Sequence, residues 1–303
     1  MTTADSEIRR HIRHLLQLSS EFYGAFRIEK HRGALWFLLN LIWDMPDEKR
    51  RVSLLRRRLR NIKHVFRENE VSDITTFLKY LRSKKLISLT LDGAEPKLTS
   101  KPRQYVTDGT EIRVTPKFHR AVTVYVESVV ADLFDSERRD AAVRAAPQLM
   151  RSIYKFMLEN YIGLWEGLLR QIASRAISDE DDAERFAGEL VRSTEFFILL
   201  HVMWERTLDS RADAYFDQEQ IWEWCRQVRE IEDGFHLEHL ERLTGVGILL
   251  ASKTDGITRY RLDRIRHGDI LGPYMSDLIT IRPRLRAQLE PLLIDEPFKH
   301  EAH

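Results

Sequence analysis

A run of arginines and a cation-bearing segment after it carry the clearest chemical signal in this sequence. Arg56, Arg57, Arg58 and Arg60 stand within five positions, and Lys79 and Arg82 follow some twenty residues later. Guanidinium and ammonium groups bind phosphate oxygens, and each one that is placed on a duplex phosphate releases condensed counterions. These residues predict the binding of a polyanion without covalent chemistry. The alternative interpretation is that the arginine run forms only a solvated helix face.

Other residue patterns that could do chemistry are weak. The sequence contains no Walker A loop, Rossmann glycine pattern, G-x-S-x-G or H-E-x-x-H. His236 and His239 could hold a metal from one helix face, but no third ligand is identifiable, so surface histidines are favoured. The acidic run 179–182 could bind magnesium, yet at a helix start it favours compensation of the helix dipole. We expect no enzyme activity, no metal, no cofactor, and a core role for Cys225.

Composition describes the class of protein. The chain has 303 residues with one cysteine, and 31% of its residues are charged. One cysteine excludes an internal disulfide framework and favours a reducing compartment. The N-terminal residues are polar where a secretion signal needs an apolar core, and the longest apolar runs are too short to cross a bilayer. We therefore expect a cytoplasmic protein with no membrane partner, long enough for two domains.

The elements that must position the cations are mostly helices. Apolar residues recur every three or four positions, which predicts helices over 5–28, 33–44, 49–66 and 72–86. The period then changes to two over 87–91 and 111–115, and Asp92-Gly93 is a turn signal. Three helices followed by a hairpin is the winged-helix order, with 94–109 as a long wing. Residues 117–175 are predicted to return to helix.

The same order is predicted twice. Leu78-Lys79-Tyr80-Leu81 precedes Leu86, a strand and Asp92-Gly93, and Leu240-Glu241-Arg242-Leu243 precedes Ile248, a strand and Asp255-Gly256. Predicted helices over 195–206 and 217–228 and a return strand over 259–262 complete the second copy. The alternative is that any amphipathic helix leads into a strand in this way. Matching upstream helices favour a true repeat.

The two copies differ in charge. Residues 47–120 contain 19 Lys and Arg against 9 Asp and Glu, a net charge of +10, whereas residues 176–241 contain 6 against 18, a net charge of −12. The basic copy has the electrostatic character of a duplex reader. The acidic copy would be repelled by phosphates and is better suited to contact protein or to regulate.

Within the basic copy, the helix that begins near Ser72 is the candidate recognition helix. If Ile74, Phe77, Leu78 and Leu81 face inward, the residues left to face a DNA groove are Asp73, Thr75, Thr76, Lys79, Arg82 and Ser83. The wing adds Lys97, Lys101, Arg103 and Arg113. The phosphate backbone would be crossed by the preceding helix with Arg56, Arg57, Arg58 and Arg60.

A family resemblance rests on this segment. The stretch Ser72-Asp73-Ile74-Thr75-Thr76-Phe77-Leu78-Lys79-Tyr80-Leu81-Arg82-Ser83-Lys84-Lys85-Leu86-Ile87 resembles the recognition helix and first strand of MarR-type winged-helix transcriptional regulators. Ile112-Arg113-Val114-Thr115-Pro116-Lys117 resembles their return strand and next helix. The resemblance covers residues 6–129 and implies a dimer built from the first and post-wing helices, with a small aromatic ligand near that junction.

These observations predict a mainly α fold with tandem winged helix-turn-helix modules joined by long helices. The expected parts are an association helix (1–30), a basic DNA-binding domain (31–120), a helical linker or dimerisation region (121–190), an acidic winged-helix-like domain (191–265) and a C-terminal helix and tail (266–303). We expect a homodimeric regulator that binds double-stranded DNA, with a possible protein partner at the acidic half. The alternative is a tandem winged-helix subunit that binds protein in an SMC/kleisin-type chromosome-organising or defence complex.

Overall fold

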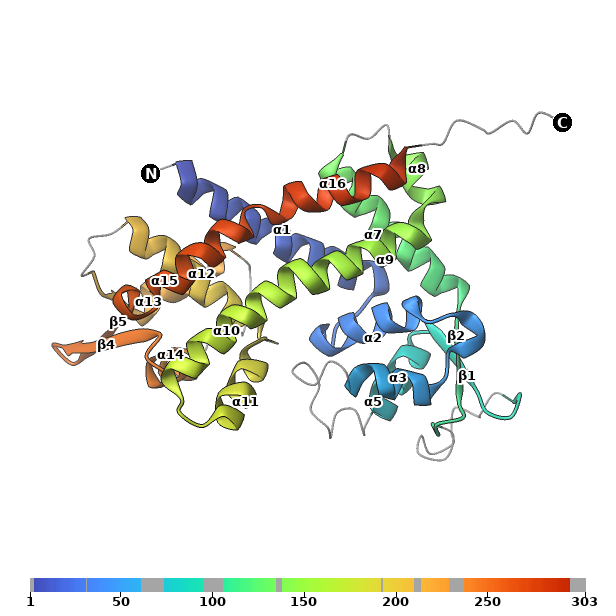
Figure 1. The fold of residues 1–303 in the computed structure, drawn as a ribbon, viewed down its shortest axis with the longest axis horizontal. Coiled ribbons are helices and arrows are strands. Elements are labelled where there is room, and N and C mark those ends of the chain that lie inside the picture. Colours follow the sequence, from blue (N-terminus) through green and yellow to red (C-terminus); the bar gives the residue numbers. More distant parts are fainter. Residues whose placement is uncertain are drawn as a thin grey trace. The chain divides into compact units, whose positions relative to one another are not determined.

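The computed structural model is mainly helical, and its described residues form two small antiparallel sheets, which confirms the predicted fold class at that level (Figure 1). It describes residues 3–30, 32–60, 74–94, 106–134, 138–191, 193–209, 214–228 and 237–294. The chain divides into two compact units. One comprises Leu18–Met157 with Pro283–His303, and the other comprises Met1–Gln17 with Leu158–Arg282.

The first of these units holds the basic half of the sequence. Its elements, two of which extend past the unit boundary, are α1 (Thr3–Phe26), α2 (Arg32–Asp44), the 3-10 helix η1 (Asp47–Lys49), α3 (Val52–Arg60), α5 (Ile74–Ser83), β1 (Ile87–Thr90), β2 (Glu111–Val114), α7 (Pro116–Leu133), α8 (Arg139–Arg144), α9 (Ala146–Met157) and α16 (Ile281–Leu293).

Aromatic side chains fill the core of this unit. Phe22 and Phe26 of α1 are fully buried, with ring centroids 5.1 Å from Tyr125 and 5.1 Å from Phe118 of α7, respectively. Trp43 of α2 also stacks on Phe118, with the ring centroids 5.7 Å apart. The apolar faces of α1 and α7, through which the resemblance implies dimerisation, are therefore packed together within one chain. The homodimer stays a prediction.

The other unit holds the acidic half. Its elements are the π-helix η3 (Leu158–Ile162), α10 (Gly163–Ala176), α11 (Glu180–Val191), α12 (Thr194–Asp209), β3 (Phe216–Asp217), α13 (Gln218–Val228), α14 (Leu237–Gly245), β4 (Leu249–Thr254), β5 (Ile257–Leu262) and α15 (Arg264–Leu278).

A histidine lies at the centre of this unit. His201 of α12 is fully buried, and Trp165, Phe197 and Tyr274 surround its ring with centroids 4.0–5.7 Å away. Its Nδ1 lies 2.5 Å from the Phe197 carbonyl oxygen and its Nε2 lies 3.0 Å from the Tyr274 hydroxyl. Because a carbonyl oxygen only accepts, Nδ1 carries the proton and Nε2 accepts from Tyr274.

Each sheet contains one more short segment than the sequence predicted. In the second sheet β3 pairs with β5, giving the strand order β3-β5-β4. In the first, Arg51 forms an antiparallel bridge with Glu111, and the Ile112 amide donates to the Arg50 carbonyl at 2.8 Å. The prediction of a helix beginning at Lys49 was therefore wrong. Arg50 and Arg51 join the hairpin, and α3 begins at Val52.

The element order recurs, so we name residues 32–115 the first repeat and residues 194–263 the second repeat. The last turn of α5 ends with Lys85 at φ +59° and a Leu86 amide bonded to the Leu81 carbonyl at 3.0 Å. The last turn of α14 ends with Gly247 at φ +69° and an Ile248 amide bonded to the Leu243 carbonyl at 2.9 Å. Both are left-handed helix ends.

The correspondence extends past the hairpins. Asp92-Gly93 and Asp255-Gly256 all have positive φ, as a two-residue type I′ turn requires. After each return strand one residue caps the next helix: the Thr115 hydroxyl accepts from the Phe118 amide, and the Asp263 carboxylate accepts from the Arg266 amide. The backbone amides of Thr115 and Asp263 donate to the carbonyls of Leu86 and Ile248. The two predicted copies therefore have the same local backbone geometry at their helix ends, turns and helix caps.

Among the described residues, no helix is both long enough and apolar enough to span a bilayer.

Candidate nucleic-acid interface

Helix α5 has a buried side and an exposed stripe. Ile74, Leu78 and Leu81 are fully buried against the rest of the first repeat. Thr76, Lys79 and Ser83, at spacing i, i+3 and i+7, are exposed and therefore lie along one face of the helix. This stripe presents two hydroxyl groups and one ammonium group, which can reach phosphates or base edges. The Ser83 hydroxyl donates to the Tyr80 carbonyl at 2.7 Å, so its oxygen remains to accept a hydrogen bond.

Contacts at its C-terminal end fix the orientation of α5. The Lys84 ammonium donates to the Glu29 carboxylate at 3.0 Å, which raises the pKa of Lys84. The Glu29 amide donates to the Tyr80 hydroxyl at 3.3 Å. Lys117 Nζ, from the start of α7, donates to the Lys84 carbonyl at 2.8 Å. The side of α5 that carries Tyr80 and Lys84 is thus attached to the domain, which leaves the stripe facing outward.

Two of the predicted α5 contacts need revision. Thr75 is buried, with 8% of its surface exposed, so the prediction that it faces a groove was wrong. It lies beside Ile74 and one turn before Leu78, and the buried arc of the helix is wide enough to include it. Phe77, which was predicted to face inward, is only half-buried, as is Arg82. Asp73 lies outside the described residues.

The arginine run on α3 divides into two pairs. Arg57 and Arg60 are exposed. Arg56 lies 2.5 Å from the Asp108 carboxylate, and Arg58 lies 2.6 Å from that of Asp44. Within the part of the chain that the structure describes, only the first pair is therefore offered to solvent with no carboxylate bound. Surface ion pairs of this kind contribute about 0–1 kcal/mol, so a phosphate can replace either carboxylate at small cost.

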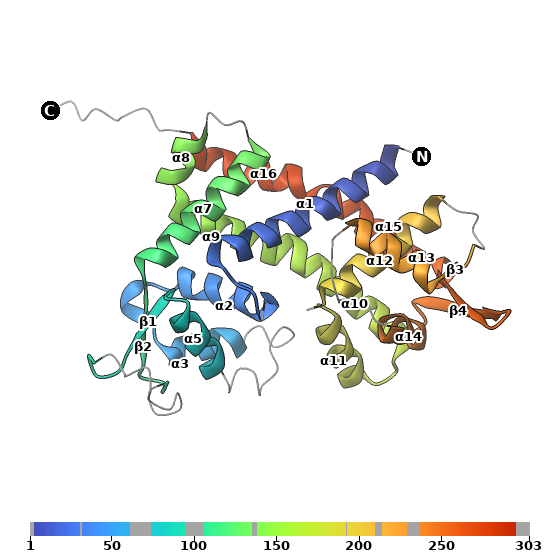
Figure 2. The ribbon, with the colours of Figure 1, turned by 180° about the vertical axis from the view of Figure 1, so that it is seen from behind.

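The hairpin adds cations that sequence reasoning partly missed. Arg113 is 65% exposed and lies 3.3 Å from Glu111. Arg51 was not predicted as a site residue. Its side chain is 56% exposed, and its guanidinium lies 3.9 Å from the same Glu111 carboxylate. Lys85 is also exposed, at the left-handed end of α5. The wing residues Lys97, Lys101 and Arg103 lie outside the described part of the chain. Figure 2 shows α3, α5 and the hairpin together at one end of this unit.

The alternatives involving metal or nucleophilic chemistry gain no support. In the part of the chain that the structure describes, no group of three His, Cys, Asp or Glu side chains could hold a metal ion. Asp179 accepts from the Asp182 amide at 2.8 Å, which is the capping role expected at the start of α11. His239 packs edge-on against Phe196 at 4.9 Å. Cys225 is buried, and burial raises its pKa to about 12.

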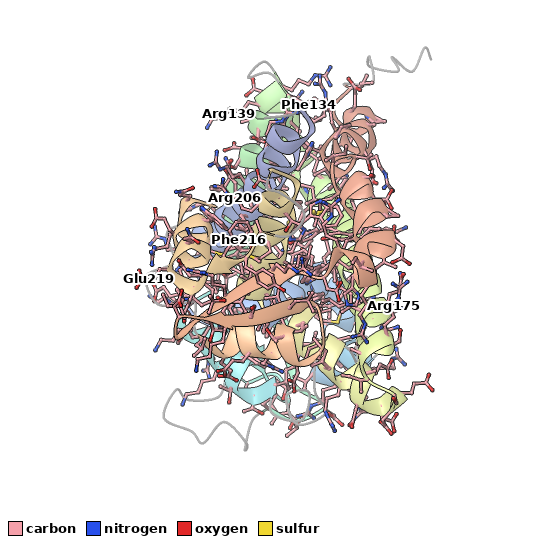
Figure 3. The ribbon with its side chains drawn as sticks, turned by 90° about the vertical axis from the view of Figure 1, so that its left-hand side faces the viewer. Phe134, Arg139, Arg175, Arg206, Phe216 and Glu219 are labelled. Atoms are coloured by element: carbon pink, nitrogen blue, oxygen red, sulfur yellow. The ribbon has the colours of Figure 1, made fainter. Side chains whose placement is uncertain are left out.

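The tryptophan pair on α13 is enclosed by its own unit. Trp222 is 8% exposed. Trp224 contacts Phe216 at a centroid distance of 4.8 Å and Arg206 at 4.7 Å, and Figure 3 shows Arg206 and Phe216 next to each other. Both indoles therefore contribute to packing in the second repeat.

Comparisons of the chain with protein-family models, with curated proteins and with solved structures find no match. Its function is therefore inferred from its own residues.

Proposed function

We propose that the first repeat is a winged-helix module that binds double-stranded DNA with α5 in the major groove, and that the protein acts as a transcriptional regulator. The observation that carries this proposal is the exposed stripe of Thr76, Lys79 and Ser83 on a helix whose opposite side is buried. A recognition helix needs these two properties, because it must be held rigidly and must present short polar side chains to base edges.

The element order supports the winged-helix assignment. Among the described residues, the first repeat contains helix α2, a bridging segment at Arg51, helices α3 and α5, and the hairpin β1-β2, in the order helix, strand, helix, helix and two strands. Helix α12, strand β3, helices α13 and α14 and the hairpin β4-β5 follow the same order. We infer a tandem winged-helix arrangement from this agreement and from the matching helix ends.

The cations around α5 would then position the module on the duplex. Arg57 and Arg60 on α3, together with Arg51, Lys85 and Arg113 near the hairpin, are exposed and could each take a phosphate. These contacts, with a further one from Lys79, supply salt-dependent affinity that is independent of base sequence, whereas Thr76 and Ser83 would supply base recognition.

A salt titration tests the proposal. The affinity of the full chain for a fluorescently labelled duplex is measured by anisotropy between about 50 and 200 mM salt, and log K is plotted against log salt concentration. We expect a steep negative slope. Each phosphate contact contributes about 0.9 to it, so Arg57→Ala/Arg60→Ala/Lys79→Ala should reduce its magnitude by up to about 3.

Arg226→Ala is the matched control, because Arg226 is an exposed arginine on α13, the helix of the second repeat that corresponds to α3. It should leave the slope unchanged. Weak duplex binding at every salt concentration would contradict the proposal and would favour the protein-binding subunit.

A further inference from the structure

The second repeat carries carboxylates where the first carries its stripe. Helix α14 buries Leu240 and Leu243 as α5 buries Leu78 and Leu81, and both pairs precede the same left-handed helix end. This register places Glu238 at the position of Thr76, Glu241 at that of Lys79 and Gly245 at that of Ser83. All three are exposed. The face that we propose for DNA recognition in one repeat is thus acidic in the other.

The inversion of charge extends to the neighbouring elements. The helices α3 and α13 each bury two side chains one turn apart, Leu55 and Leu59 in one and Ile221 and Cys225 in the other. This match places exposed Glu223 at the position of Arg57, whereas exposed Arg226 lies at the position of Arg60 and has the same charge. The bridge Arg51–Glu111 of the first sheet corresponds to the pair Asp217–Arg259 of the second, with the two charges exchanged.

The carboxylates on α13 and α14 are exposed and are therefore accessible to a partner. Glu219, a further acidic residue of α13, is exposed and points away from the helices in Figure 3. Glu223 is 57% exposed, and its carboxylate pairs with Arg226 at 3.2 Å. Beside Glu238, the side chain of Leu237 is 43% exposed.

We propose that this acidic face, defined by Glu219, Glu223, Glu238 and Glu241, binds the basic face of a second copy of the chain, defined by Arg57, Arg60 and Lys79. The two faces are complementary in charge, because the named residues of one are acidic and those of the other are basic. The net charges of +10 over residues 47–120 and −12 over residues 176–241 extend this complementarity beyond the named residues.

Such a contact joins the acidic face of one copy to the basic face of another. The two surfaces differ, so the interface is heterologous. One copy uses its second repeat and the other its first, so further copies can add at either free end. The basic face is also the face that we propose for DNA, so association and DNA binding would exclude each other. This exclusion rests on the proposed function, whereas the association itself does not.

Sedimentation velocity without DNA tests the association. At tens of micromolar protein, the wild-type chain should associate near 50 mM salt and dissociate near 500 mM, where the Debye length falls to about 4 Å. Glu238→Lys/Glu241→Lys should abolish association at low salt, and so should Arg57→Glu/Lys79→Glu. Glu180→Lys/Asp181→Lys, with the same change of net charge at exposed positions of α11, should not.

Mixing identifies the occupant of the acidic face. In Glu238→Lys/Glu241→Lys both faces are basic, and in Arg57→Glu/Lys79→Glu both are acidic. Copies of the same variant therefore repel each other, whereas copies of the two different variants attract each other. An equimolar mixture should therefore recover the low-salt association that neither variant shows alone. Recovery would establish that the two faces bind each other across copies. A mixture that stays monomeric, or a wild-type chain that is monomeric at every salt concentration, would overturn the proposal.

Duplex affinity separates this inference from the proposed function. At protein concentrations too low for association, Glu238→Gln/Glu241→Gln should bind DNA as the wild type does, and at associating concentrations the variant should bind more DNA. A higher affinity of the variant at all concentrations would show that the acidic face covers the basic face within one chain, which overturns the intermolecular contact. Loss of DNA binding alone would leave the association result intact.

Discussion

At the scale of single residues, the structure distinguishes side chains that the sequence cannot tell apart. Arg56 and Arg57 are adjacent, yet one is paired with Asp108, which lies more than fifty positions away in the chain, and the other is exposed. The sequence could predict that this run is helical and basic. It could not predict which arginines pair with a carboxylate, because only the tertiary fold brings Asp108, before β2, and Asp44, at the end of α2, next to α3.

His201 gives a prediction at this scale. Burial lowers its pKa to about 4, from an ordinary value of 6.5. The unfolded state therefore binds a proton between pH 6.5 and 4 while the folded state does not, so stability is complete above pH 6.5 and falls as the pH decreases. Protonation of His201 in the unfolded state thus lowers the free energy of unfolding by about 3 kcal/mol between pH 6.5 and 4.

Hydrogen exchange of the α12 amides, corrected for intrinsic rates, measures this free energy at each pH. His201→Gln should be less stable than the wild type at pH 7 and should show a pH dependence that is flatter by about 3 kcal/mol between pH 6.5 and 4. Parallel curves for the two proteins would contradict the assignment of this linkage to His201.

At the scale of elements, periodicity predicted the helices and turn signals predicted the hairpins. The sequence missed the short edge segments Arg51 and β3, because two residues are too few to show an alternating pattern. It misplaced Thr75 for a related reason. Period arguments locate the centre of a buried face well, but the width of that face depends on the tertiary neighbours.

The left-handed ends of α5 and α14 give a matched prediction. Lys85, at φ +59°, bears the strain of a side chain in this region, so Lys85→Gly should leave stability unchanged or raise it by up to about 1 kcal/mol. Gly247, at φ +69°, is strained by any side chain, and a Cβ there would lie 2.5 Å from Arg266 Nη1. Gly247→Ala should therefore cost more than about 1 kcal/mol.

Urea unfolding of both variants, with hydrogen exchange to assign the affected unit, measures these changes. We expect that Gly247→Ala lowers the free energy of unfolding and that Lys85→Gly does not. A loss of stability in Lys85→Gly as large as that in Gly247→Ala would show that the two helix ends are not equivalent.

At the scale of the whole molecule, the near-neutral net charge of +1 conceals two modules of opposite sign. The sequence predicted this asymmetry and the repeat. It did not predict that the charges are exchanged at particular corresponding positions, because that comparison needs the register that the buried side chains and the strand pairing provide. The inverted pairs at Arg57 and Glu223 and at Lys79 and Glu241 give each repeat a different partner in our proposals.

The most direct test compares two charge reversals at corresponding positions. Lys79→Glu and Glu241→Lys change one exposed side chain each, by the same magnitude of charge, on α5 and α14. In anisotropy titrations with a labelled duplex near 50 mM salt, Lys79→Glu should weaken binding by at least tenfold, which corresponds to about 1.4 kcal/mol. Glu241→Lys should bind at least as tightly as the wild type. Equal losses in the two variants, or an unchanged affinity in Lys79→Glu, would contradict recognition of DNA by α5.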